Sequence, residues 1–167
     1  DGRTSFPYTK ADVSALAELH YTPPEPLTVM ASDGVTPLYG VLYKPWDFDP
    51  SKRYPVIDCI YAGPFTTVVP WSFVGNATSL TANSLAQMGF IVVVLDARGT
   101  PGRGKAFQDA NYGRLGQTEI PEHTAGLKQA AATRPYMDLS RMGIYGHSWG
   151  GYFALGRGGA NSPAAPA

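Results

Sequence analysis

The chain has 167 residues and a mass of 17.9 kDa, which is enough for one domain with a substantial core. Its 13 basic residues balance its 13 acidic residues, so the composition excludes the positive surplus of nucleic-acid-binding proteins, and we expect no nucleic acid partner. One cysteine and three histidines give neither a disulfide nor a zinc-ligand spacing, so we expect no metal and no cofactor. The longest apolar run, 90–95, is far shorter than the about 18 residues of a membrane span. With no recognisable targeting segment, the sequence indicates a soluble protein with no membrane partner and leaves its compartment open.

The N-terminal part of the chain predicts a lead-in segment followed by a hairpin. Residues 1–26 contain four prolines and one short amphipathic stretch, 12–19, which we expect to be helical. The pattern then changes, because 27–31 and 37–43 flank a Ser-Asp-Gly turn, which is typical of two paired strands. A polar loop that contains proline follows the hairpin.

Strands that alternate with helices are predicted for the remainder of the chain. The apolar, β-branched runs 56–62 and 90–95 predict strands that are buried on both faces. Helices are expected at 79–88 and 121–134, and a third strand, 142–146, leads directly into a further helix. This alternation predicts an α/β fold with a mostly parallel sheet and flanking helices.

A short motif after the third strand indicates nucleophilic catalysis. Residues 146–150 read Gly-His-Ser-Trp-Gly and match the pattern G-x-S-x-G, in which a serine occupies a sharp turn between a strand and a helix. Because the backbone doubles back at close range in such a turn, a Cβ at Gly146 or Gly150 would collide with a neighbouring strand or helix. The alternative is a glycine-rich turn that contains an incidental serine.

Three segments of the chain resemble the prolyl oligopeptidase family, and its dipeptidyl peptidase IV branch most closely. They are Gly-His-Ser-Trp-Gly-Gly-Tyr at 146–152, Tyr-Ala-Gly-Pro at 61–64, and the glycine-rich stretch 96–107 that begins Asp-Ala-Arg-Gly. The three segments occur in the order of the family and at plausible spacing. The resemblance implies a partial α/β-hydrolase fold.

The resemblance also predicts how the chain is divided. Residues 27–155 would form the N-terminal part of an α/β-hydrolase peptidase domain, without the strands that follow the serine turn. Residues 1–26 resemble the connection from a preceding β-propeller. Residues 156–167 are small residues and proline without apolar periodicity, so we expect a tail outside the fold.

By resemblance, the chain is a serine peptidase that hydrolyses peptide substrates after proline through an acyl-enzyme on Ser148. The hydroxyl of Tyr61 and the backbone N–H of Trp149 would stabilise the oxyanion that forms in this reaction. The side chain of Trp149 resembles the aromatic residue that lines the proline-accepting pocket, and ordinary core packing is its alternative role. Tyr152 would also contact the substrate.

Other reactive residue types receive structural interpretations. We expect Asp96 and Arg98, at the end of the second apolar run, to fix the following loop through charge-assisted hydrogen bonds. Cys59 lies within a strand and is interpreted as a small buried hydrophobic residue. The histidines are expected on the surface or hydrogen-bonded in the core, and not as the base for the serine; they are His20, His123 and His147.

The sequence does not complete a catalytic triad. In α/β-hydrolases the acid and the histidine follow the serine, whereas no Asp, Glu or His follows Ser148 in this chain. We therefore expect the base to come from sequence outside this chain or from another copy. Without a base the serine hydroxyl stays protonated, so we expect the chain alone to be inactive.

Two alternatives to a peptidase stay open. A non-catalytic, hydrolase-like module would bind or assemble through the bare edge of strand 142–146, which would also allow self-association. An esterase would use the same serine and the same oxyanion donors, and it would hydrolyse aryl esters but not prolyl amides.

Overall fold

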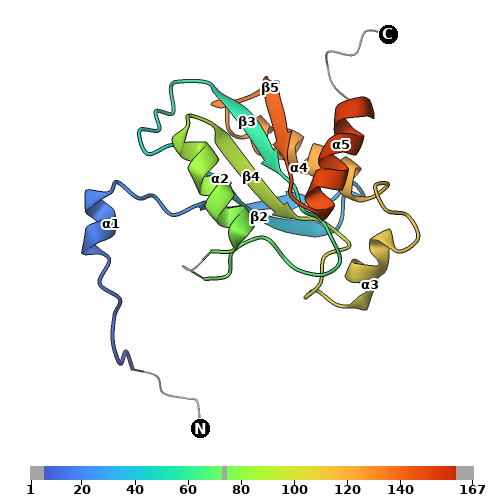
Figure 1. Cartoon of the computed structure of the whole chain (residues 1–167), viewed down its shortest axis with the longest axis horizontal. Coiled ribbons are helices and arrows are strands. Elements are labelled where there is room, and N and C mark those ends of the chain that lie inside the picture. Colours follow the sequence, from blue (N-terminus) through green and yellow to red (C-terminus); the bar gives the residue numbers. More distant parts are fainter. Residues whose placement is uncertain (1–5, 73–74, 161–167) are drawn as a thin grey trace.

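A five-stranded sheet with helices on both faces forms the centre of the structure (Figure 1). This computed structural model describes residues 6–72 and 75–160, with the backbone alone for 157–160. Of the expected lead-in segment and tail, residues 1–5 and 161–167 therefore lie outside the described part of the chain.

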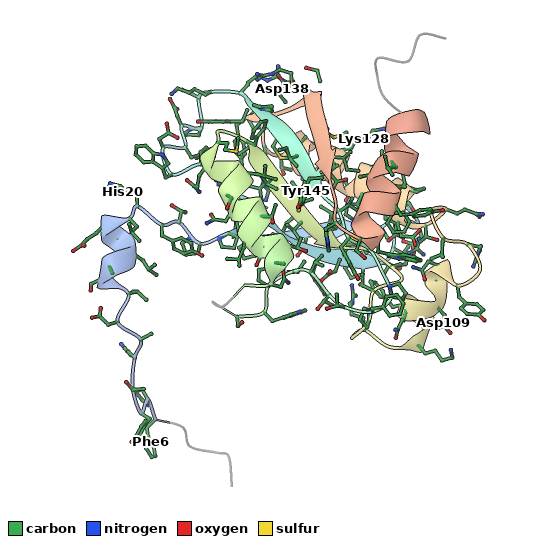
Figure 2. The ribbon with its side chains drawn as sticks, in the orientation of Figure 1. Phe6, His20, Asp109, Lys128, Asp138 and Tyr145 are labelled. Carbon is green, nitrogen blue, oxygen red and sulfur yellow. The ribbon has the colours of Figure 1, made fainter. Side chains whose placement is uncertain are left out.

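The N-terminal segment extends away from the sheet. Its helix α1, Ser14–Glu18, buries none of its residues, which confirms the helix expected at 12–19 in a shorter form. Figure 2 shows Phe6 apart from the body of the domain, whereas the ring of His20 lies 5.7 Å from the ring of Trp46, between β2 and β3. The first strand begins at Glu25, two residues before the expected start of the folded part.

The five strands have the order β1-β2-β4-β3-β5 in the sheet. The first two are the expected hairpin, the next two are the expected apolar runs, and the last leads to the serine turn. Their bounds are β1 Glu25–Met30, β2 Pro37–Tyr43, β3 Tyr54–Cys59, β4 Ile91–Asp96 and β5 Met137–Tyr145. Every residue of β4 is buried, as expected for a strand that is covered on both faces.

The sheet is mixed. Strand β2 runs antiparallel to both β1 and β4, whereas β3 runs parallel to both β4 and β5. The hairpin supplies the antiparallel part, because two strands that are joined by a tight turn run in opposite directions. The expected α/β architecture is confirmed, with its parallel part confined to β4, β3 and β5.

Strand β5 lies at one edge of the sheet. Among the described residues it pairs with β3 alone, and no strand follows it. It begins at Met137, earlier than the expected 142–146, and Figure 2 labels Asp138 and Tyr145 near its two ends. The bare edge that the sequence predicts at this strand is therefore present in the described part of the chain.

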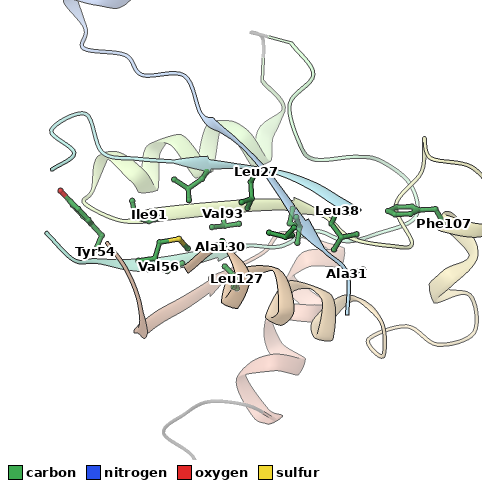
Figure 3. Packing of buried hydrophobic residues seen from close by; sticks show 14 residues of the cluster. Leu27, Ala31, Leu38, Tyr54, Val56, Ile91, Val93, Phe107, Leu127 and Ala130 are labelled. Carbon is green, nitrogen blue, oxygen red and sulfur yellow. The ribbon is translucent and has the colours of Figure 1, made fainter. Parts of the chain in front are cut away.

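Helices pack on both faces of the sheet. Their bounds are α2 Ala77–Gln87, α3 Lys105–Gln108, η1 Asp109–Asn111, α4 Glu119–Ala132 and α5 Trp149–Ala160. Ala82 and Ala86 of α2 pack against the face that contains Val92 and Val94. Helix α4 packs Leu127 and its neighbours against the other face (Figure 3). Alternate residues of β4 thus contribute to two separate hydrophobic layers.

Helix α5 is longer than the sequence predicts. It continues to Ala160, so 156–160 is helical and the expected tail does not begin at Gly156. Glycine lowers helix propensity by about 1 kcal/mol but does not forbid a helix, particularly where tertiary packing supports it. That support includes Phe153, which is buried in a small core cluster with Ile60 and Ala97.

Candidate active site

Ser148 occupies the turn between β5 and α5. The strand ends at Tyr145 and the helix begins at Trp149, so the chain reverses within a few residues. Ser148 has a φ of 55°, a left-handed conformation that costs a residue with a Cβ about 1–2 kcal/mol. The expected sharp turn between strand and helix is confirmed, and Ser148 is exposed on it.

The two glycines of the motif are required by close packing. An ideal Cβ on Gly146 would lie 2.2 Å from the carbonyl oxygen of Gly150, in the first turn of α5. A Cβ on Gly150 would lie 2.0 Å from the carbonyl oxygen of Ile60, which directly follows β3. Both positions therefore exclude a side chain, as the sequence predicts, and the serine turn is wedged between its own helix and the end of β3.

The segment that carries Tyr61 packs directly against the serine turn. We call residues 60–70, which follow β3, the Tyr61 loop. A Cβ on Gly150 would lie 3.1 Å from the Cα of Tyr61, and a Cβ on Gly63 would lie 2.3 Å from Cδ1 of Trp149. The structure thus brings Tyr61, Ser148 and Trp149 into one region, although Tyr61 is distant from the other two in the sequence.

Aromatic rings form one side of this region. Trp149 is half-buried and stacks on Tyr152, with ring centroids 5.9 Å apart. Phe65 of the Tyr61 loop meets Trp149 edge-to-face at 6.3 Å and is 78% exposed. Trp149 also contacts buried Phe153, so its ring packs against the core and borders the exposed aromatic surface. Its Nε1 is buried and has no hydrogen-bond partner among the described residues.

Asp96 anchors the Tyr61 loop. This residue ends β4, and its carboxylate accepts hydrogen bonds from the backbone N–H groups of Val68 at 2.8 Å and Val69 at 3.3 Å. Burial raises the pKa of Asp96 above its usual value, and the two N–H donors oppose that shift. The expected structural role is confirmed, but the loop that Asp96 holds is the Tyr61 loop and not the glycine-rich loop that follows it.

Arg98 fixes the start of the glycine-rich loop. Its side chain pairs with the buried carboxylate of Glu122 in α4 and, at 2.7 Å, with Asp33 in the β1–β2 turn. Its backbone N–H donates to the second oxygen of Glu122 at 2.7 Å. The expectation that Arg98 acts through charge-assisted hydrogen bonds is therefore confirmed.

The three histidines lie in different environments. His20 and His147 are exposed, whereas His123 is fully buried and its Nδ1 lies 2.8 Å from Oδ1 of buried Asp58. The Nε2 of His123 has no hydrogen-bond partner within the described part of the chain, so it is not bonded to Ser148. Each histidine is thus on the surface or hydrogen-bonded in the core, as the sequence predicts.

Cys59 is inaccessible. It ends β3 within the core layer that α2 covers, and it has 0% exposure. Burial, and to a smaller extent the neighbouring charge of Asp58, raises the pKa of its thiol to about 12. The expected role as a small buried hydrophobic residue is confirmed.

A cavity of about 860 Å³ lies away from the serine turn, where α1 and the prolines that follow it face β2 and α2. Its walls include Leu16, Pro24, Val41 and Leu80.

Within residues 6–72 and 75–160, no group of three or more acidic, histidine or cysteine side chains could hold a metal ion. No helix in that part of the chain is long and apolar enough to cross a membrane.

Sequence reasoning missed several residues of this region. Gln108 of α3 donates from Nε2 to the carbonyl oxygen of Pro64 at 3.1 Å, and no local pattern distinguishes it from a surface glutamine. Phe65 directly follows the Tyr-Ala-Gly-Pro segment, a position that could have drawn attention to it. Asp58 is a charged residue within an apolar run, which is itself a signal of a buried polar partner.

Comparisons with known proteins identify a peptidase family. A family model described as the prolyl oligopeptidase family matches residues 76–158. Mouse dipeptidyl peptidase 8 is 43% identical over 135 residues, which cover 81% of this chain and 15% of that protein. The chain therefore spans about 15% of the length of this curated relative.

Solved structures show the same fold. A putative dipeptidyl aminopeptidase IV from Bacteroides ovatus superimposes with a TM-score of 0.72 at 36% identity, covering 78% of this chain and 18% of that one. Porphyromonas gingivalis dipeptidyl peptidase 4 gives a TM-score of 0.71 at 33% identity, covering 87% of this chain and 20% of that one. The mixed sheet with its flanking helices is thus similar to part of these peptidase structures.

Proposed function

Because this chain belongs to the prolyl oligopeptidase family of serine peptidases, we propose that Ser148 is the nucleophile of a dipeptidyl-peptidase-type enzyme that cleaves after proline. One observation carries the proposal: exposed Ser148 has a left-handed φ at the start of α5, directly beside the Tyr61 loop. A strained backbone at an exposed serine between strand and helix is typical of an acyl-transfer nucleophile.

In the proposed reaction, Oγ of Ser148 attacks the scissile carbonyl carbon while a base takes its proton. The carbonyl oxygen then carries a negative charge. Trp149 is the first residue of α5, and the N–H groups of the first turn of a helix have no intrahelical acceptor. Its N–H would donate to the oxyanion, and the hydroxyl of Tyr61 would donate a second bond, each contributing about 2.7–4 kcal/mol. The base then gives this proton to the amine nitrogen as the C–N bond breaks, which leaves an acyl-enzyme on Ser148 that water hydrolyses.

The aromatic side chains beside the serine turn favour binding of an apolar substrate residue. Trp149, Tyr152 and Phe65 present ring surfaces next to the serine turn, and both Tyr152 and Phe65 are mostly exposed. The pyrrolidine ring of proline is compact and apolar, so it would bury well against such rings. We therefore assign substrate contact to Trp149 and Tyr152.

The general base is supplied from outside this chain in our proposal. No Asp, Glu or His follows Ser148 in the sequence, and His123 is committed to Asp58 in the core. In this chain alone, Ser148 would keep its proton and react slowly. Removal of a triad member still leaves about 10³–10⁴-fold acceleration from the oxyanion donors and binding, so a slow reaction at Ser148 is expected to be measurable.

The test is covalent modification of Ser148 by a fluorophosphonate probe, with and without imidazole as a substitute base. Intact-mass measurement and peptide mapping follow the modification in the folded chain and in a Ser148→Ala control. We expect modification at Ser148 that imidazole accelerates and that the control lacks. Absence of modification at Ser148 in a folded sample with imidazole present would overturn the proposal.

Protection of Ser148 from the probe by dipeptides distinguishes a peptidase from an esterase. We expect Ala-Pro-amide at millimolar concentration to slow the modification of Ser148, whereas Ala-Gly-amide does so less. Equal effects of the two dipeptides, combined with rapid acylation by aryl esters, would contradict proline recognition and favour an esterase.

An assembly role is the second candidate, and the edge position of β5 favours it. The strand has one pairing neighbour among the described residues, and an unpaired edge presents backbone N–H and C=O groups that another strand can bind. Two copies of the chain would associate through this edge. Sedimentation velocity over a range of concentrations tests this association, since a monomer at every concentration would exclude the assembly role.

A further inference from the structure

The backbone next to Tyr61 is strained. Ala62 has a φ of 51°, a left-handed conformation that is unfavourable for a residue with a Cβ. Such a conformation persists only where the surrounding contacts determine it. On the upstream side, the backbone N–H of Ile60 donates to the carbonyl oxygen of Tyr145 at 2.9 Å, which ties the start of the Tyr61 loop to β5.

The far end of the Tyr61 loop is held separately. The carboxylate of Asp96 accepts hydrogen bonds from the N–H groups of Val68 and Val69. Nδ2 of Asn76, the N-cap of α2, donates to the carbonyl oxygen of Val68 at 2.9 Å. These contacts fix the loop at its downstream end, but they leave the backbone between Ala62 and Val68 to be held by other contacts.

Gln108 provides a contact in this middle part of the Tyr61 loop. Its Nε2 donates to the carbonyl oxygen of Pro64 at 3.1 Å, two residues beyond the strained Ala62. Gln108 is the last residue of α3. The backbone N–H of Gly99 donates to the carbonyl oxygen of Phe107 in the same helix at 2.8 Å. The glycine-rich loop and the Tyr61 loop are therefore joined through α3.

We propose that Gln108 is a positioning residue that acts through Tyr61: by holding Pro64, it keeps Ala62 in its left-handed conformation and the Tyr61 hydroxyl in place for the oxyanion. This inference rests on the proposed function. Gln108 touches neither the serine turn nor the reacting atoms in this role. Without its hydrogen bond, Ala62 can relax toward a negative φ, and Tyr61 then loses its fixed position beside the serine turn.

A double-mutant cycle tests the proposal in the full chain. The Gln108→Met substitution keeps the length of the side chain and removes the donor. The rate of Ser148 modification by a fluorophosphonate with imidazole is measured in the original chain, in Gln108→Met, in Tyr61→Phe and in the double variant. We expect Gln108→Met to lower the rate about tenfold in the original background and to have no further effect once Tyr61 is Phe.

A matched control comes from Gln129. Its side-chain amide bonds the backbone N–H and C=O of Met30, both at 2.8 Å, so Gln129→Met removes a similar contact between α4 and the edge strand β1, outside the Tyr61 loop. We expect this control to leave the rate unchanged. Circular dichroism verifies that each variant is folded, and Gln108→Glu, which has the same shape but no donor, replaces Gln108→Met if that variant unfolds.

The outcomes separate the positioning role of Gln108 from the oxyanion role of Tyr61. An unchanged rate in Gln108→Met, or an equal loss in both backgrounds, would overturn the positioning role while leaving the role of Tyr61 intact. An unchanged rate in Tyr61→Phe would instead overturn the proposed oxyanion role of Tyr61, and the positioning role with it. No modification of Ser148 in any of the four proteins would overturn the proposed function itself.

Discussion

A Cβ on Gly63 would lie 2.3 Å from Cδ1 of Trp149, so the Tyr61 loop meets the first turn of α5 at a position that only glycine can occupy. The same Cβ would lie 3.0 Å from Cε1 of Tyr61. Gly63 therefore separates the two aromatic residues to which we assign the oxyanion donors. The spacing of these two side chains depends on a residue that has no side chain.

Substitution of Gly63 by Ala should displace the Trp149 ring and destabilise the domain. Overpacking of this kind costs about 1–3 kcal/mol, which urea denaturation can measure. Gly143→Ala is the matched control, because a Cβ there would meet only Cγ1 of Ile57 at 3.9 Å. Equal stabilities for the two variants would show that the contact between Gly63 and Trp149 is not tight in solution.

Loss of Arg98 should be far more costly than loss of another paired arginine. Arg98→Ala leaves the carboxylate of Glu122, whose side chain is 0% exposed, without its cationic partner, and breaking such a buried pair costs about 3–5 kcal/mol. Arg53 pairs with Asp138 but its side chain is 65% exposed, so Arg53→Ala should cost less than about 1 kcal/mol. Chemical denaturation of both variants compares them, and similar losses would contradict the buried character of the Glu122 pair.

The thiol of Cys59 should report on unfolding. Only a thiolate reacts rapidly with a disulfide reagent, and burial raises the pKa of this thiol to about 12. We expect no reaction of the native chain with an aromatic disulfide at pH 8 and one equivalent in urea. Because the chain has a single cysteine, Cys59→Ala should abolish the signal. Rapid reaction without denaturant would mean that the core layer beneath α2 opens readily.

The contribution of Asp138 should depend on pH. Hydrogen bonds from the Ser140 hydroxyl and from Arg141 lower the pKa of Asp138 from 3.8 to about 2. A lowered pKa in the folded state adds stability above the unfolded value, and this stability is lost as the pH falls through the folded value. The difference in unfolding free energy between the original chain and Asp138→Asn should therefore shrink from pH 4 toward pH 2. A constant difference would contradict this origin of the shift.

A charge on the edge strand should oppose self-association. Lysine on an exposed edge is a common device against strand pairing, and a Cβ on Gly143 in β5 would meet only Cγ1 of Ile57, at an ordinary contact distance of 3.9 Å. We expect Gly143→Lys to abolish any concentration-dependent increase in sedimentation coefficient while preserving the circular dichroism spectrum. Unaltered association would place the contact elsewhere on the molecule.

Local sequence patterns predict the parts of this fold that are locally determined. The apolar runs at 56–62 and 90–95 correspond to β3 and β4, because a strand that is covered on both faces needs apolar residues at every position. The steric role of the motif glycines is also local, since the turn itself forces the close approach of Gly146 and Gly150.

Contacts between distant segments could not be predicted in this way. Asp58 and His123 come together only because α4 packs over β3, and Gln108 reaches Pro64 only because α3 folds back toward the Tyr61 loop. Residue type alone does not reveal such partners. The extension of α5 to Ala160 was missed for a related reason, because packing of Phe153 outweighs the weak helix propensity of the glycines that follow.

The parallel pairing of β3 with β5 has a consequence for how reactivity arises during folding. Tyr61 follows one of these strands and Ser148 follows the other, and the two strands are separated in the chain by α2, β4, α3, η1 and α4. Pairing between strands so distant in sequence is slow, because loop-closure entropy must be overcome before the contacts form. A serine probe that is applied during refolding should therefore report when β3 and β5 pair, because modification of Ser148 should begin only after these two strands have come together.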